Sequence, residues 1–258
     1  MNIFITGGTS GIAFEVAKKL ASQNHVVYIG THTKKEYKNL KVKLKNYKNL
    51  IPIKFDVTKD IDKLSKFDID VLYLHAGIGQ GGSISEIPIN KVRENYEVNV
   101  FSNFSVLQVV LKNMIKKGKG KIVIMASLLG IMPFKFLGIY SSTKASIISL
   151  TTALRKEIKM INKNIHICLI EPGAYRTGFN QIMLNNKYDF MKNDSYFKGQ
   201  IRNIRKKEEL LWKLMEKKNL NSIVNKIVKC ILTKSNKFIY RAPISQVIFV
   251  KLYNLFKM

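Results

Sequence analysis

Short apolar runs, many of them β-branched, alternate along the chain with longer segments of helical periodicity. Nearly continuous apolar runs are typical of strands that are buried on both faces of a parallel sheet. They predict strands at residues 2–6, 25–30, 49–57, 70–77, 120–127, 164–172 and 237–241. Apolar residues spaced three or four apart predict helices at residues 11–23, 34–47, 90–117, 140–161 and 221–233. The alternation predicts an α/β protein with a doubly wound parallel sheet, in which ligands bind at the strand ends.

Residues 178–220 interrupt this alternation with a polar, basic segment, and an insertion after a late strand predicts a lid over a substrate site. Its aromatic residues are Tyr188, Phe190, Tyr196, Phe197 and Trp212. The part from 187 to 218 carries ten Lys or Arg against five Asp or Glu. It either clamps an anionic substrate, lies on a lipid surface, or forms an exposed amphipathic helix. In the last interpretation the pocket is covered by Leu210, Leu211, Leu214 and Met215.

The C-terminal segment, residues 243–258, has the pattern of a basic amphipathic helix. Its apolar stripe contains Ile248, Leu252, Leu255 and Phe256, and Lys251 and Lys257 flank the stripe. Such a tail either lies in a membrane interface, docks on its own domain, or contacts another subunit.

Composition narrows the class of protein without identifying a ligand. The 258 residues, with no Pro-rich linker and no internal repeat, predict one domain over residues 1–258. The net charge of +27 favours an anionic partner such as a membrane, but lysines scattered from Lys18 to Lys257 equally fit a solvated surface. Without a focused arginine and aromatic cluster, nucleic acid is not the expected partner. Two cysteines, no metal-ligand spacing and no apolar leader predict a cytoplasmic protein without a metal, with contact at the inner membrane face left open.

A glycine-rich turn follows the first predicted strand and leads directly into a helix. Glycine permits a tight turn and a close approach of the backbone to a ligand, and the first amides of a helix attract phosphate. The stretch therefore predicts a dinucleotide-binding loop built from Gly7, Thr9, Ser10, Gly11 and Ile12.

A second motif places Tyr140 and Lys144 four residues apart in a predicted helix, and hence on one helical face. The ammonium group of Lys144 is then close enough to influence the phenol of Tyr140. Alone, this spacing is more typical of a solvated surface pair than of a catalytic one.

Taken together, these motifs resemble the compact branch of the short-chain dehydrogenases/reductases, a family with a Rossmann-type fold. The first turn resembles the family's T-G-x-x-x-G-I-G, with Ala13 in place of the last glycine. Residues 74–77 resemble its N-N-A-G motif, with His75 in place of an asparagine. We interpret His75 as a histidine satisfied by backbone groups rather than a catalytic one. The resemblance covers residues 1 to 178.

The resemblance implies a catalytic tetrad and a set of cofactor contacts. The tetrad would consist of Asn99, Ser127, Tyr140 and Lys144. Besides the glycine-rich loop, the cofactor would be contacted by Thr31, Asp56, Val57, Ala76, Gly77, Tyr140, Lys144, Pro172, Gly173 and Thr177. Tyr140 would protonate a carbonyl oxygen that Ser127 holds, while Lys144 lowers the pKa of the phenol and holds the nicotinamide ribose. Asn99 would anchor a helix backbone and a water that connects Lys144 to solvent.

The stretch after the second predicted strand bears on the choice between NADP and NAD. Sites that prefer NAD usually have a carboxylate there for the ribose hydroxyls, but this chain has Gly30, Thr31 and His32. Thr31 is expected to bond a 2′-phosphate, with Lys34 or Lys35 in reach. The sequence therefore favours NADP, with NAD still possible.

By resemblance, the expected activity is NADP-dependent reduction of a carbonyl to an alcohol on a small, hydrophobic or lipid-like molecule. One alternative is a 3-oxoacyl-[acyl-carrier-protein] reductase, which would use the positive surface. An alternative of another class is a nucleotide-sensing or nucleic-acid-binding module. The complete tetrad disfavours this alternative, because a binding module does not need a proton relay. The family resemblance also implies a homo-oligomer, dimer or tetramer, packed through residues 90–117 and 140–161.

Overall fold

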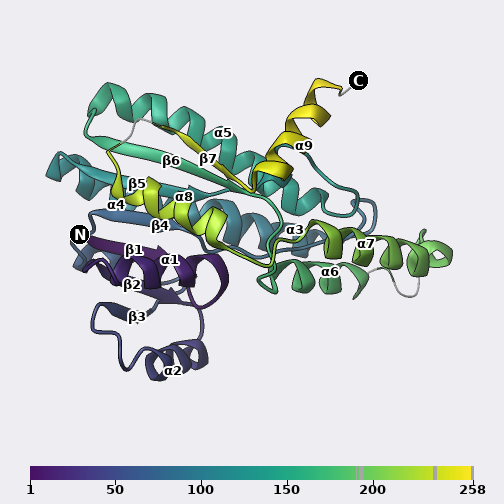
Figure 1. Ribbon diagram of the computed structural model, residues 1–258, viewed down its shortest axis with the longest axis horizontal. Coiled ribbons are helices and arrows are strands. Elements are labelled where there is room, and N and C mark those ends of the chain that lie inside the picture. The colour runs from purple at the N-terminus through teal and green to yellow at the C-terminus, as the bar shows by residue number, and fades with distance from the viewer. Residues whose placement is uncertain (190, 192–194, 235–236, 257–258) are drawn as a thin grey trace.

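The computed structural model describes residues 1–189, 191, 195–234 and 237–256, and these residues form one parallel sheet covered by helices on both faces (Figure 1). The strand order is β3-β2-β1-β4-β5-β6-β7. The strands are β1 (Asn2–Thr6), β2 (Val26–Thr31), β3 (Leu50–Lys54), β4 (Val71–Leu74), β5 (Gly120–Met125), β6 (Ile165–Pro172) and β7 (Ile239–Ala242). The predicted doubly wound α/β sheet is confirmed.

Helices fill both faces of the sheet and form the lid and the tail. They are α1 (Gly11–Ala21), α2 (Lys34–Lys43), α3 (Ile89–Tyr96), α4 (Ser102–Lys117), α5 (Gly138–Ile161), α6 (Phe179–Asp189), α7 (Ile201–Met215), α8 (Asn221–Leu232) and α9 (Ile244–Leu255). Short turns of other helix types are η1 (Ile61–Lys66), the π-helical η2 (Glu97–Phe101), η3 (Leu128–Gly130) and η4 (Lys198–Gln200). Within the described residues, no helix is long and apolar enough to span a bilayer.

The side chains of each strand alternate between two hydrophobic cores. Ile3 and Ile5 of β1 pack in the core formed with α1 and α8, whereas Phe4 between them packs in the core formed with α4 and α5. Because both faces are covered, the strands have no polar face, which explains the continuous apolar runs in the sequence.

Three predicted strands were too long at their carboxyl ends, and one of them, β5, ends at Met125 rather than residue 127. β3 ends at Lys54 rather than residue 57, and β4 ends at Leu74 rather than residue 77. Phe55 and Val57 are buried like strand residues, but they lie in the loops that leave the sheet at its carboxyl edge. Burial of an apolar run therefore does not distinguish a strand from the loop that follows it.

The segment after β6 contains α6, η4 and α7, which extend from the carboxyl edge of the sheet (Figure 1). Ser195 and the backbone N–H of Tyr196 donate hydrogen bonds to Glu86, in the loop before α3. Inside the segment, Lys187 of α6 forms an ion pair with Glu208 of α7, and the Tyr188 hydroxyl donates to the same carboxylate at 2.7 Å. Phe190 and Lys257, named from the sequence, lie outside the described residues.

The hydroxyl of Thr6 joins the ends of neighbouring strands β1 and β4. Thr6 is fully buried, and its Oγ1 accepts hydrogen bonds from the backbone N–H groups of His75 and Ala76, each at 3.0 Å. These bonds hold the turn after β1 against the turn after β4, where the glycine-rich loop begins.

We expect Thr6→Val to lower the free energy of unfolding by about 2 kcal/mol, because two buried N–H groups lose their acceptor while the side-chain volume is kept. Urea unfolding followed by circular dichroism measures this change. Thr6→Ser keeps the hydroxyl and serves as the control. Equal stability of the valine and serine variants would contradict this role of the hydroxyl.

Candidate active site

A cavity of about 630 Å³ lies at the carboxyl edge of the sheet, between the strand ends and the lid. It brings together nearly all of the residues proposed from the sequence, although they come from six separate parts of the chain. Those that line it are Gly7, Thr9, Ser10, Gly11, Ile12, Asp56, Val57, Ala76, Gly77, Ser127, Tyr140, Lys144, Pro172, Gly173 and Thr177. Asn99 lies beneath the wall, and Thr31 does not line the cavity.

The first turn of α1 opens into this cavity. Gly7 has a φ of 65°, and a Cβ atom there would lie 2.8 Å from the Cα of Ala76, so only glycine fits. Gly11 has a φ of 61°, and Thr177 packs across it from the start of the lid. The first turn of α1 contains no acidic residue. Free amides at the start of a helix, with a backbone that comes close enough to reach a ligand, fit a dinucleotide pyrophosphate.

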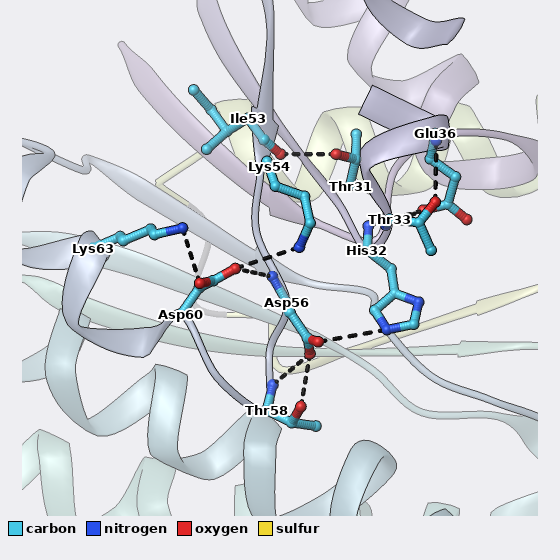
Figure 2. A network of polar contacts seen from close by, with 10 residues as sticks. All are labelled: Thr31, His32, Thr33, Glu36, Ile53, Lys54, Asp56, Thr58, Asp60 and Lys63. Carbon is cyan, nitrogen blue, oxygen red and sulfur yellow. Dashed lines mark hydrogen bonds and ion pairs between the residues drawn. The ribbon is translucent and has the colours of Figure 1, made fainter. Parts of the chain in front are cut away.

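The other end of the cavity is bordered by the loops after β2 and β3 (Figure 2). Asp56 accepts hydrogen bonds from Thr58 N and Thr58 Oγ1, at 3.0 and 2.7 Å, and lies 3.5 Å from His32 Nε2. Burial alone would raise the pKa of Asp56, but the Thr58 hydrogen bonds and the neighbouring charges of His32 and Lys54 lower it below its ordinary value. Asp56 is therefore a fixed anionic acceptor at the place expected for the adenine end of a dinucleotide.

The proposed contact of Thr31 with a 2′-phosphate is not supported by this geometry. Thr31 is fully buried, and its Oγ1 donates a hydrogen bond to the carbonyl oxygen of Ile53, in the neighbouring strand β3, at 3.1 Å (Figure 2). Thr31 is the last residue of β2, and its side chain is packed against the neighbouring strand. The next residue, His32, lines the cavity instead.

Glu36 is a cavity residue that the sequence interpretation missed. Its carboxylate accepts hydrogen bonds from His32 N at 2.9 Å and Thr33 N at 3.0 Å, while Thr33 Oγ1 accepts from Glu36 N (Figure 2). This reciprocal arrangement is a capping box at the start of α2, and the spacing Thr33-x-x-Glu36 signals it in the sequence. A carboxylate therefore does reach this region, from the helix rather than from the strand end.

Helix α5 places Tyr140 and Lys144 on its buried face. Lys144 Nζ lies 5.7 Å from the centroid of the Tyr140 ring and donates to the carbonyl oxygen of Met125 at 3.0 Å. Ser127 follows β5, and its hydroxyl accepts a hydrogen bond from Leu129 N at 3.1 Å and bonds the phenol of Tyr140. The three side chains meet beside the end of the central strands, as the motifs had suggested.

Asn99 lies in the π-helical turn between α3 and α4, where the sequence pattern had predicted uninterrupted helix. Its Oδ1 accepts from Ile78 N at 2.8 Å, and its Nδ2 donates to Ile78 O at 2.9 Å and to Thr143 Oγ1 at 3.1 Å. A Cβ atom at Gly77 would lie 3.1 Å from Asn99 Oδ1 and 3.7 Å from Lys144 Nζ. Asn99 thus connects the loop after β4 to α5, and π turns of this kind are frequent at functional sites.

The pKa values of the buried pair differ from the sequence expectation. Burial raises the pKa of Tyr140, and its hydrogen bond with Ser127 opposes that rise only in part. Burial also lowers the pKa of Lys144 to about 8. The protein's own groups therefore favour a neutral phenol, which suits a proton donor, and leave the charge of Lys144 sensitive to pH near neutrality.

His75 is satisfied by the backbone, in agreement with its sequence interpretation. Its Nδ1 lies 3.0 Å from the carbonyl oxygen of Gly7, so Nδ1 carries a proton and donates it. Burial, with a smaller effect from the charge of Lys144, lowers the pKa of His75 to about 4. The neutral ring braces the turn after β1 against β4.

The substrate end of the cavity is apolar. Its wall is formed by Leu129, Met132, Phe134, Phe179, Ile182, Trp212, Met215, Phe249 and Val250. The Phe179 ring at the start of the lid lies 5.7 Å from that of Tyr140, centroid to centroid. Among the described lid residues, none with a positive charge lines the cavity. Lys187 is committed to Glu208, so an anionic clamp formed by the lid is not supported.

The predicted cover of the cavity by α7 needs a correction. Trp212 and Met215 line the cavity, whereas Leu210, Leu211 and Leu214 are exposed to solvent. The inner face of the helix carries Trp212 and Met215, because Trp212 packs next to Met183 and Leu184 of α6. The three leucines therefore lie on the outer face.

Comparison with known proteins shows the family to which the chain is similar. The family described as short chain dehydrogenase matches residues 1–187. The chain is 32% identical over 179 residues to 3-ketodihydrosphingosine reductase of Bacteroides thetaiotaomicron, across 69% of this chain and 65% of that protein. It is 30% identical over 188 residues to NADPH-dependent 3-dehydrocapnine reductase of Ornithobacterium rhinotracheale, across 67% of this chain and 65% of that protein. The matches thus span just under two thirds of the length of both relatives.

A solved structure of a short chain dehydrogenase/reductase from Burkholderia phymatum in complex with NAD superimposes with a TM-score of 0.82. The superposition covers 98% of this chain and 92% of that chain, at 18% sequence identity. At this identity the likeness shows the fold alone.

Lys144 should destabilise the folded chain in a pH-dependent way. Its folded pKa of about 8 lies below the ordinary 10.5, so between these values the unfolded chain binds the extra proton and stability rises with pH. We expect Lys144→Met to be more stable than the original chain at pH 7 by up to about 3 kcal/mol. This advantage should shrink between pH 8 and 10.5.

Urea unfolding of both proteins across this pH range measures the effect, because other titrations cancel in the difference. Lys112→Met, at an exposed site on α4, is the control. A stability difference for position 144 that is constant with pH would show that Lys144 has an ordinary pKa.

Proposed function

The chain belongs to the short-chain dehydrogenase family, and from this we propose that it is an NADP-preferring oxidoreductase that reduces a carbonyl on a hydrophobic, lipid-like molecule. Membership of the family implies an oxidoreductase that depends on a nicotinamide dinucleotide. One observation carries the finer proposal: Ser127, Tyr140 and Lys144 meet at the inner end of a cavity whose outer wall is apolar.

The residues that would hold the dinucleotide are those of the glycine-rich loop, Asp56, and the segment from Pro172 to Thr177. The bound nicotinamide would supply the hydride. In the reductive direction, the Tyr140 hydroxyl donates its proton to the carbonyl oxygen of the substrate, and Ser127 hydrogen-bonds the same oxygen. The cation of Lys144 stabilises the phenolate that Tyr140 leaves behind. Asn99 acts as a positioning residue, because it holds the loop at Ile78 and α5 in place.

The proposed substrate class rests on the wall of the cavity. Aromatic and aliphatic side chains from the loop after β5, from the lid and from α9 form one continuous apolar surface around the outer end. Such a wall stabilises an alkyl or acyl chain by removing it from water. Two relatives named above are reductases of 3-ketodihydrosphingosine and 3-dehydrocapnine, and a lipid-like ketone would suit this wall as well.

The proposed preference for NADP rests on the loop after β2. No carboxylate is present between Gly30 and His32, and the exposed cavity residue His32 replaces it. A relative named above is NADPH-dependent. Glu36 opposes the preference, but its carboxylate is already committed to the backbone N–H groups of His32 and Thr33.

Two alternatives lead to different experiments. A 3-oxoacyl-[acyl-carrier-protein] reductase would act on acyl thioesters carried by an acidic protein, so turnover would fall when the carrier is replaced by a short soluble thioester. A nucleotide-sensing or nucleic-acid-binding module would bind dinucleotide without turning over any carbonyl. The cytoplasmic location and the dimer or tetramer packed through residues 90–117 and 140–161 stay predictions.

We expect Tyr140→Phe to lose at least about 100-fold in turnover, because the variant keeps the ring but removes the proton that the carbonyl oxygen receives. Stopped-flow and steady-state oxidation of NADPH with long-chain ketones measure turnover, and fluorescence titration checks that the variant still binds the dinucleotide. Tyr47→Phe, at an exposed position outside the cavity, is the matched control. Full turnover by Tyr140→Phe would refute the assignment.

His32→Asp should shift the ratio of NADPH to NADH affinity toward NADH by at least about tenfold, because a carboxylate at the cavity wall repels a 2′-phosphate and accepts from ribose hydroxyls. Glu36→Gln should shift the ratio the opposite way, since it removes a negative charge from the same loop. Fluorescence titrations at moderate salt measure both ratios. If neither variant moves the ratio, this loop does not contact the 2′ position.

A further inference from the structure

Helix α9 projects from the body of the molecule at the carboxyl edge of the sheet (Figure 1). Its inner side is anchored: Val247 and Val250 pack against Met132 and its neighbours, and Gln246 Oε1 accepts from Ala174 N at 2.7 Å. All described residues from Lys251 onward are exposed. Between residues 244 and 256, seven large apolar or aromatic side chains face solvent, namely Ile244, Ile248, Phe249, Leu252, Tyr253, Leu255 and Phe256.

The same helix forms part of the wall of the active-site cavity. Phe249 lines the cavity and is also half exposed, so it stands at the cavity's mouth. Gln246 Nε2 donates to Met215 O at 2.8 Å, which places the last turn of α7 beside the first turn of α9. Leu211 and Leu214 of that turn are exposed as well. We call these two leucines and the seven exposed apolar or aromatic residues between Ile244 and Phe256 the mouth surface.

Most charges around the mouth surface are positive, although Glu216 directly follows the last turn of α7, where it accepts a hydrogen bond from Asn180 Nδ2 at 2.7 Å. From Lys217 to the C-terminus the sequence has nine Lys or Arg and no Asp or Glu. Lys213 and Lys251 are exposed on α7 and α9 next to residues of the mouth surface, and Lys135 is exposed in the loop that packs against α9. Exposed apolar side chains flanked by cations are the composition of helices that lie in the interface of anionic membranes.

Two other occupants fit less well. A second copy of the chain, seated face to face, would bring like-charged lysines together around the contact. A folded protein partner would cover Phe249 and with it the mouth of the cavity. A bilayer meets neither objection, because its anionic headgroups neutralise the lysines and its interior is itself a source of apolar molecules.

We propose that the mouth surface docks on an anionic lipid bilayer, with its apolar side chains at the boundary of headgroups and acyl chains. The cavity then opens toward the membrane, and a lipid carbonyl enters past Phe249 without crossing water. The docking stands on the surface alone, whereas this entry route rests on the proposed function.

The test is flotation of the full chain with vesicles of phosphatidylcholine containing phosphatidylglycerol, and with vesicles of phosphatidylcholine alone, without any nucleotide. We expect partitioning to the anionic vesicles that weakens with added salt, since part of the attraction is electrostatic. L252S/F256S should reduce the partition coefficient at least about tenfold, because two exposed apolar side chains outside the cavity wall are removed.

M160S is the matched control, because Met160 is 88% exposed near the end of α5, roughly 30 Å from Tyr140 along that helix. The proposal is overturned if the original chain does not float, if L252S/F256S floats as well as M160S, or if light scattering shows an oligomer that L252S/F256S dissociates. Turnover of a short soluble ketone should be the same in L252S/F256S and the original chain. Docking without turnover of any carbonyl would reject the proposed function and leave the docking intact.

Discussion

The close contact between the turns after β1 and β4 is the constraint on which the site depends. Gly7 comes so near to Ala76 that no Cβ atom fits between them, and Thr6 and His75 close the contact with three hydrogen bonds. Parallel neighbours end at the same edge of a sheet, so this contact decides where the first turn of α1 points. The position of the glycine-rich loop relative to Tyr140 follows from it.

Burial then determines the chemistry available at that edge. It keeps the phenol of Tyr140 protonated and weakens the hold of Lys144 on its own proton. A buried cation without a carboxylate partner lowers the stability of the folded chain. Lys144 therefore costs stability, but it places a positive charge next to the reacting group. The π turn at Asn99 belongs to the same balance, because it gives up regular helix to fix the loop that borders Lys144.

The outer half of the molecule follows a different principle, in which apolar surface is left uncovered. The lid buries Trp212 against α6 but exposes the leucines of the same helix, and α9 buries one side and exposes the rest. The cavity wall continues into this exposed surface through Phe249. An apolar cavity that opens onto an apolar, cation-rimmed surface suits a substrate that resides in lipid.

The sequence by itself determined the sheet, the order of its elements and the glycine-rich loop, because these depend on periodicity and on spacings within single elements. The meeting of Ser127, Tyr140 and Lys144, which lie on two separate elements, was implied only by the family resemblance. Only the tertiary structure decided that Thr31 points into the sheet, that Glu36 reaches the cavity from α2, and that the leucines of α7 face outward. It also decided the pKa of Lys144, since burial comes from elements distant in sequence. These outcomes depend on which way individual side chains point and on which elements pack against them. A local sequence pattern contains neither kind of information.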